Sequence, residues 1–164
     1  MNTARFNFTA LFVAISMATA PAAVGAACER TTGSSQPPSK TFPPSENWYG
    51  SEQLAVILPR DGAWPGLGPT YNFRDKLFFW SVGFEFGSEK NLKVTGVRLD
   101  GNTPPAVISK ATNAYAESLG GWTMLVLVEL PSTGCWQITA EYLGEKLTFV
   151  VETQIDNPDH AART

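Results

Sequence analysis

The chain has few of the residues from which catalytic and metal-binding sites are built: its 164 residues include one histidine, two cysteines and three methionines. The histidine, His160, lies in a polar tail, so a Ser-His-acid triad or a Cys-His pair would need this tail to reach a folded site. The chain has no Gly-x-Ser-x-Gly elbow, no dinucleotide fingerprint and no His/Cys cluster for zinc. We therefore expect a protein that is not an enzyme, with no catalytic residues, no metal and no cofactor.

Positive charge is also scarce. The chain has 12 Lys and Arg against 15 Asp and Glu, a formal net charge of −3 at pH 7. No basic cluster stands out, which argues against nucleic acid and against an anionic membrane surface as partners. A glycosidase would need only two carboxylates, and Glu85, Glu129 and Glu141 are the candidates. We expect these acids to face solvent, which is the ordinary role of charged residues on strands.

No apolar run is long enough to span a bilayer comfortably. The N-terminal run, residues 8–20, follows the positive charge of Arg5 and ends at Pro21, after which small residues follow. This pattern is typical of a secretory signal peptide, here residues 1–26 with cleavage after Ala26. We expect an exported protein, periplasmic or secreted, and the alternative is an N-terminal anchor helix that is retained.

The two cysteines, Cys28 and Cys135, are far apart in the sequence. An even pair in an exported chain favours a disulfide, which would close a loop of more than a hundred residues and stabilise the fold by up to about 4–5 kcal/mol. The alternative is lipidation, because residues 25–28 resemble the lipobox of bacterial lipoproteins, with Gly25 where an aliphatic residue is usual. A lipidated Cys28 would anchor the protein to the cell envelope and would exclude the disulfide.

Composition divides the rest of the chain into three parts. Residues 27–47 are rich in Pro, Ser and Thr and have no hydrophobic period, which predicts an extended arm. Residues 48–153 carry strand signals and very little helical period, which predicts one β-domain. Residues 154–164 are polar, as expected of a frayed tail.

Alternating apolar residues mark the strands of the domain, which we expect within residues 54–58, 78–86, 92–99, 106–109, 122–130, 135–142 and 147–151. Residues 78–86 form one long strand or two strands joined at Gly83, and a β-bulge at Gly96 accounts for a change of parity. One helical turn is expected near residues 111–118. About seven strands predict an all-β sandwich, with a small closed barrel as the alternative. The strand aromatics assigned to the core are Phe78, Trp80, Trp122, Trp136 and Phe149.

The neighbours Cys135 and Trp136 predict the path of the disulfide. Adjacent residues of a strand point to opposite faces of the sheet, so a buried Trp136 places Cys135 on the outer face. The bridge should therefore hold the N-terminal arm against the outside of the sheet or along its edge, where the arm could cover an edge strand.

One stretch of the sequence and one wider pattern each resemble known proteins. The stretch LPSTGCWQITAEYLGEKLTFVV, residues 130–151, resembles the closing strands of bacterial immunoglobulin-like domains. The wider pattern is similar to that of a set of uncharacterised bacterial exported proteins. Its members share a cysteine after the signal, a Trp-Tyr-Gly motif, an Arg-Leu-Asp-Gly motif and a Gly-Cys-Trp strand. These are Cys28, residues 48–50, residues 98–101 and residues 134–136 of this chain. The resemblance implies export and an immunoglobulin-like antiparallel sandwich, and it implies no activity.

Binding is the function class that remains. Trp48, Tyr49 and Trp64 lie outside the clear strand cores and could stack against a glycan. The same rings could instead cap the open ends of the sandwich or anchor the arm. We expect a structural or protein-interaction role, with an unknown protein or glycan as partner. The alternatives are a carbohydrate-binding module and a lipoprotein that reaches the membrane through Cys28.

Overall fold

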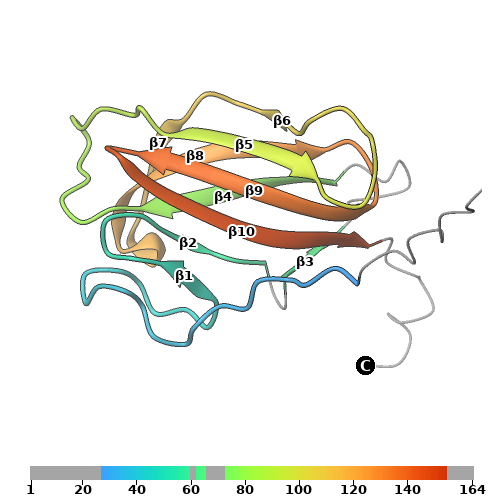
Figure 1. The fold of residues 1–164 in the computed structure, drawn as a ribbon. Coiled ribbons are helices and arrows are strands. Elements are labelled where there is room, and N and C mark those ends of the chain that lie inside the picture. Colours follow the sequence, from blue (N-terminus) through green and yellow to red (C-terminus); the bar gives the residue numbers. More distant parts are fainter. Residues whose placement is uncertain (1–26, 60–61, 66–72, 155–164) are drawn as a thin grey trace, which may run out of the picture.

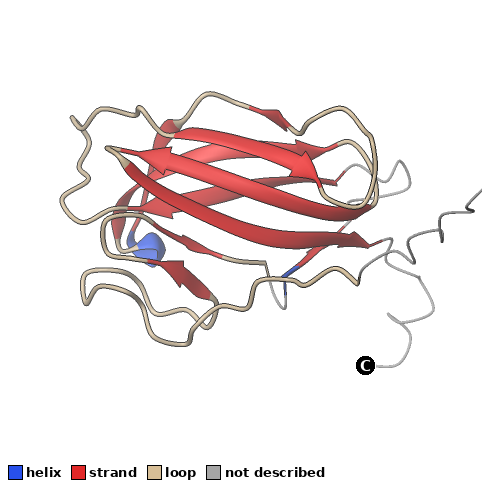
Figure 2. Ribbon diagram, in the orientation of Figure 1, coloured by secondary structure: helices blue, strands red, loops and turns tan. Residues whose placement is uncertain are grey.

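Strands and loops make up nearly all of the computed structural model, which describes residues 27–59, 62–65 and 73–154 (Figure 2). The predicted signal peptide, residues 1–26, and residues 155–164 of the tail lie outside the described residues. The strands are β1 Trp48–Gly50, β2 Ala55–Ile57, β3 Ala63–Pro65, β4 Phe73–Trp80, β5 Lys93–Arg98, β6 Val107–Ile108, β7 Thr112–Ala116, β8 Gly121–Leu130, β9 Gly134–Tyr142 and β10 Glu145–Gln154. A 3₁₀ turn, η2, spans Glu117–Leu119.

These strands form two sheets packed face to face (Figure 1). One sheet has the order β1-β2-β4-β8-β6, with β7 also paired to β8, and the other has the order β3-β10-β9-β5. All pairs are antiparallel except β3 with β10. The prediction of an all-β sandwich is confirmed.

The core between the sheets follows the alternation of apolar residues. On β9, Trp136, Ile138 and Ala140 are fully buried, and on β10 the same is true of Phe149 and Val151. One face of each strand therefore points into the core, as the sequence pattern predicts. The main core is built from this face of both sheets.

A second hydrophobic cluster lies on the outer face of the sheet that contains β1, β2 and β4. Trp80, Ala55 and Trp48 are buried there against Phe42, which comes from the N-terminal arm. The inward residues of β4 have odd numbers, among them Leu77 and Phe79. The end of β4, residues 77–80, is therefore apolar on both faces because each face packs against a different cluster.

The structure of residues 78–86 differs from the prediction, because the second cluster buries the outer face at the end of β4. The strand ends at Trp80, and the chain turns at Ser81, whose carbonyl accepts a hydrogen bond from Phe84 N. Phe78 is only half-buried, and Phe86 is 65% exposed. The assignment of Phe78 to the core is therefore wrong, and Trp80 is buried as predicted but in the second cluster, on the outer face of the sheet.

Of two smaller predictions, the first is wrong and the second is right only in part. Gly96 lies in regular register opposite Ile138, with no bulge. A Cβ at Gly96 would come within 2.7 Å of Ala106 Cβ, so glycine is needed there for close packing. The helical turn expected at residues 111–118 is mainly strand β7, and only η2 is helical.

Candidate functional site

The disulfide joins Cys28 to Cys135 on the outer face of β9. Trp136, the next residue, is fully buried, so the predicted outward direction of Cys135 is confirmed. The arm continues along the edge of β10, where Thr31 N donates to the carbonyl of Val150 and Val150 N donates to Thr31 Oγ1, both at 2.9 Å. Figure 1 shows the arm below β10 on its way to β1. The arm therefore covers an edge that would otherwise be open.

Arg98, Asp100 and Gly134 form a compact structural cluster beside the disulfide. Arg98 Nε donates to Asp100 Oδ1 at 2.6 Å, and this bond holds the pKa of Asp100 below its ordinary value. A Cβ at Gly134, whose φ is +136°, would lie 2.6 Å from Arg98 Nε. Two of the motifs that carry the resemblance, residues 98–101 and residues 134–136, thus meet, and they fix the end of β5 against β9.

Of the three aromatic residues predicted to stack on a ligand, the two tryptophans lie inside the protein. Trp48 is 1% exposed, and its Nε1 donates to the carbonyl of Pro43 at 3.1 Å. Trp64 is 0% exposed in the main core. Tyr49 is half-buried, with its ring edge-on to Phe149. Burial makes the two indoles unavailable to a ligand, and Trp48 instead anchors the arm through Phe42 and Pro43.

A different aromatic group reaches solvent at one end of the sandwich. Trp122 lies between Phe86 and Tyr115, with ring centroids 4.9 Å and 5.0 Å away. Phe86 is 65% exposed and Tyr115 is 58% exposed. Trp122 is half-buried, so its assignment to the core outright is wrong. It lies on the inward side of β8, but at the start of the strand, where it is only partly covered.

Three connections meet at this end, which we name the loop end: the β4–β5 loop (residues 81–92), the β7–β8 connection (residues 117–120) and the β9–β10 turn (residues 143–144) (Figure 1). Tyr142 ties two of them together, because its hydroxyl donates to the carbonyl of Glu89 at 3.1 Å. Burial of Tyr142, with the charge of Glu89 as a second cause, raises the pKa of the phenol.

The turn at the loop end contains the one non-glycine residue with positive φ in the described part of the chain, Leu143 at 48°. Gly144 follows with a φ of 88°, so the pair has the positive angles of a type I′ hairpin turn. Asparagine or aspartate normally occupies the first position of such a turn, because a bulky side chain is strained there. Leu143 is also 73% exposed. An apolar residue that is both strained and exposed makes this turn a candidate for a binding site.

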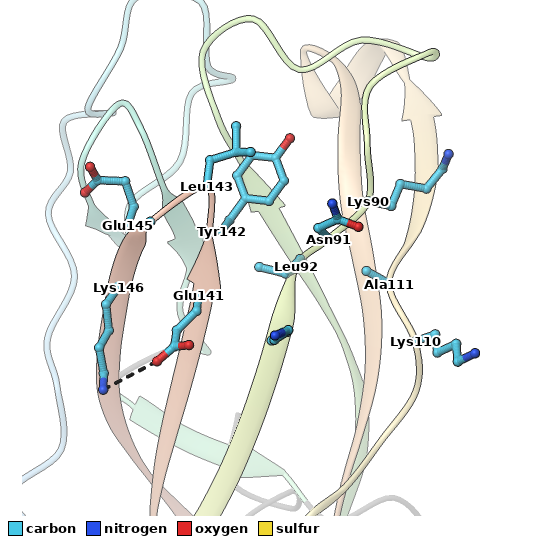
Figure 3. A pocket seen from close by; sticks show the side chains of 12 residues that line it. Lys90, Asn91, Leu92, Lys110, Ala111, Glu141, Tyr142, Leu143, Glu145 and Lys146 are labelled. Atoms are coloured by element: carbon cyan, nitrogen blue, oxygen red, sulfur yellow. Dashed lines mark ion pairs between the residues drawn. The ribbon is translucent and has the colours of Figure 1, made fainter.

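A groove of about 910 Å³ runs from Leu143 between the start of β5 and the segment before β7 (Figure 3). Four lysines and two glutamates line it, a balance of two positive charges in a chain whose net charge is −3. Lys146 and Glu141 pair at 3.5 Å on one side, and Lys90 and Lys110 lie on the other.

The carboxylates considered for hydrolysis are not brought together. Glu129 and Glu141 lie on outward-facing positions of different sheets, and Glu85 lies in the β4–β5 loop. Within the described residues no group of three or more His, Cys, Asp and Glu could hold a metal ion.

Sequence reasoning missed Phe86, Tyr115 and Leu143 as surface residues. One signal could have found the last of them: a Leu-Gly pair stands where a two-residue hairpin turn favours Asn-Gly. In comparisons with known proteins, no family model, curated protein or solved structure matches the chain. No helix in the described ranges has the length and apolar character that crossing a membrane requires.

Proposed function

We propose that this chain is an exported, non-enzymatic domain of immunoglobulin-like topology that binds a partner protein at its loop end. The strand order supports the topology: β2-β4-β8-β6 corresponds to the order A-B-E-D of immunoglobulin domains, and β10-β9-β5 corresponds to G-F-C. In this correspondence the β4–β5 loop and the β9–β10 turn are the B–C and F–G loops. These are loops that antibody variable domains use for binding.

Export is supported by the disulfide between Cys28 and Cys135, which indicates an oxidising compartment. We place the protein in the periplasm or outside the cell. The lipoprotein alternative needs the sulfur of Cys28, which the disulfide already occupies.

The observation that carries the proposal is the set of apolar side chains at the loop end: the rings of Phe86, Trp122 and Tyr115, and Leu143 on the neighbouring β9–β10 turn. Three of these side chains are more than half exposed, at 65%, 58% and 73% for Phe86, Tyr115 and Leu143. Grouped exposed aromatics of this kind are typical of interaction sites, where they supply contact area at low entropic cost. The backbone of Leu143 is also strained, so keeping this leucine exposed at the turn costs conformational free energy.

A glycan is the alternative occupant, because Trp122 and its two neighbours offer ring faces for stacking. The rings are inclined to one another by 47° and 50°. They therefore form a ridged surface instead of a flat platform, which favours interdigitating protein side chains over a sugar ring.

Site-specific photo-crosslinking tests the proposal. A photoreactive leucine analogue at position 143 should give a discrete adduct with one partner protein in the exporting host. The matched control is the same analogue at Leu99, which is 52% exposed at the opposite end of β5. Phe86→Ala should remove the adduct without lowering the unfolding temperature, since that ring is mostly exposed. Equal adducts at both positions, or none at position 143, would contradict the proposal. Quenching of tryptophan fluorescence by a glycan, abolished by Tyr115→Ala, would support the glycan alternative instead.

A further inference from the structure

Strand β5 has a free edge that faces the groove. The two-residue hairpin turn after Tyr142 makes Tyr142 and Glu145 a hydrogen-bonded pair, and such pairs then alternate along β9. The residues of β9 that pair with β5 are the intervening ones, opposite Lys93, Thr95 and Val97. The N–H and C=O groups of Val94 and Gly96 therefore point away from β9.

One of these outward groups is already used. The carbonyl of Gly96 accepts a hydrogen bond from Ala106 N at 3.0 Å. Within the described residues, the outward N–H and C=O of Val94 and the N–H of Gly96 have no hydrogen-bond partner. The open part of the edge is centred on Val94 and runs from Leu92 to Thr95, about 13 Å long at about 3.3 Å per residue, because Gly96 is buried against Ala106.

The two edges of this sheet differ in the way they are protected. The edge of β10 is covered by β3 and by the arm that the disulfide holds in place. No segment of the described chain covers the edge of β5 beside Val94. The opposite wall of the groove is fixed, because Ser109 N donates to the carbonyl of Leu127 at 3.0 Å.

The side chains around this edge combine an apolar floor with positive charge. Leu92 and Tyr142 are buried at 6% and 4% exposure and line the floor with Ala111. Lys93 and Lys110 border the groove from its two walls, and neither forms an ion pair among the described residues. An acidic chain with alternating apolar residues complements both features.

We propose that the groove binds an extended acidic segment of the partner protein, which adds as a strand to the free edge of β5 at Val94. This inference rests on the proposed function and names the chemistry of the partner. The segment pairs about four residues, since Ala106 closes the edge at Gly96. Its apolar side chains face Leu92 and Tyr142, and its carboxylates face the lysines.

Lysine beside an open edge also has a purely protective use, because it discourages pairing with any other strand. A peptide titration separates the two roles. Nuclear magnetic resonance spectra of the purified, disulfide-bonded protein are recorded with a capped hexapeptide of alternating Glu and Val, and with its counterpart of alternating Lys and Val. Binding of the acidic peptide shifts the amide signals of β5 and slows hydrogen exchange of Val94 N–H. The basic peptide leaves these signals unchanged.

A charge-reversal pair tests the contribution of the lysines. Lys93→Glu with Lys110→Glu should weaken binding of the acidic peptide about tenfold. Lys40→Glu with Lys76→Glu makes the same change in net charge at exposed positions outside the groove, and should change the dissociation constant by less than about twofold. Val94→Pro removes the outward N–H and should abolish the strand pairing.

The inference is overturned if the acidic peptide shifts no β5 amide, if the basic peptide gives the same shifts, or if the control pair weakens binding equally. The proposed function can fail separately. A partner crosslinked at Leu143 without peptide binding at β5 would retain the function and overturn the strand addition. Peptide binding at β5 without any crosslinked partner would retain the strand addition and overturn the proposed function.

Discussion

Removing the disulfide tests whether the arm stabilises the whole sandwich. The change is Cys28→Ala together with Cys135→Ala, which leaves no free thiol. The bridge closes a loop of 107 residues. In the chain-entropy model such a loop removes about 16 cal/mol/K from the unfolded chain, or about 4.8 kcal/mol at 25 °C. A domain of this size has a net free energy of unfolding of about 5–15 kcal/mol, so the variant should lose a large part of it.

Urea unfolding followed by tryptophan fluorescence measures the loss, since Trp48, Trp64 and Trp136 are buried and report the folded state. With a slope of about 1.5–2 kcal/mol/M, the midpoint should fall by about 2–3 M. Thr31→Val is the matched control, because it keeps the bridge and removes one hydrogen bond between the arm and β10. That bond contributes about 1 kcal/mol, so the control midpoint should fall by about 0.5 M.

Two results would refute this reasoning. One is an unchanged midpoint in the double cysteine variant, which would mean that the closed loop does not restrict the unfolded chain. The other is a control that falls as far as the cysteine variant, which would mean that arm contacts carry the stability. Hydrogen exchange at Val150 separates local release of the arm from global unfolding, because its N–H is bonded to Thr31.

Two further variants test the cluster beside the disulfide. Gly134→Ala should lower the free energy of unfolding by about 2–4 kcal/mol in urea, because its φ is +136° and its Cβ would lie 2.6 Å from Arg98 Nε. Gly87→Ala, which has open space around its Cβ, should leave the midpoint unchanged, and equal effects of the two would contradict the argument. The pKa of Asp100 is lowered in the folded state by Arg98, so its stabilising contribution is present above the unfolded pKa near 4 and is lost as pH falls through the folded pKa. Urea midpoints from pH 6 to pH 2 should therefore fall less steeply in Asp100→Asn than in the parent protein, and parallel curves would contradict this assignment.

The parts of the fold that the sequence predicts best are the strands with one buried and one solvated face. β9 and β10 alternate strictly, so their register, their inward residues and the outward position of Cys135 all follow from periodicity. The disulfide follows from the cysteine count and the predicted signal peptide. In these places one local rule decides the structure.

β4 could not be predicted in the same way, because its second apolar face is covered by a residue of the arm. Phe42 stands alone in a Pro- and Ser-rich stretch with no period, and its burial against Trp48 and Trp80 depends on where the disulfide directs the arm. The same contact places Trp48 inside the protein. The arm and β4 differ in composition, and a contact between them leaves no periodic pattern in the sequence of either segment.

The loop end was missed for a related reason. Exposure of Phe86 and Tyr115 depends on where the two sheets stop covering each other, and that limit is set by the lengths of several strands together. Apolar residues in a strand pattern are assigned to the core by default. Leu143 is the exception, since the turn it occupies has a well-defined residue preference that leucine violates.

The two edges of the sheet that contains β9 connect stability to function. An exposed strand edge invites pairing with other chains, and this domain closes the β10 edge with its own arm and a covalent tether. The β5 edge has no such cover among the described residues at Val94, which lies beside lysines and an apolar floor. That edge is adjacent to the turn where Leu143 is exposed in a strained conformation. The sheet therefore has one open edge, and this edge lies next to the exposed apolar residues. A domain with this arrangement can accept a strand from one partner while its other edge rejects pairing.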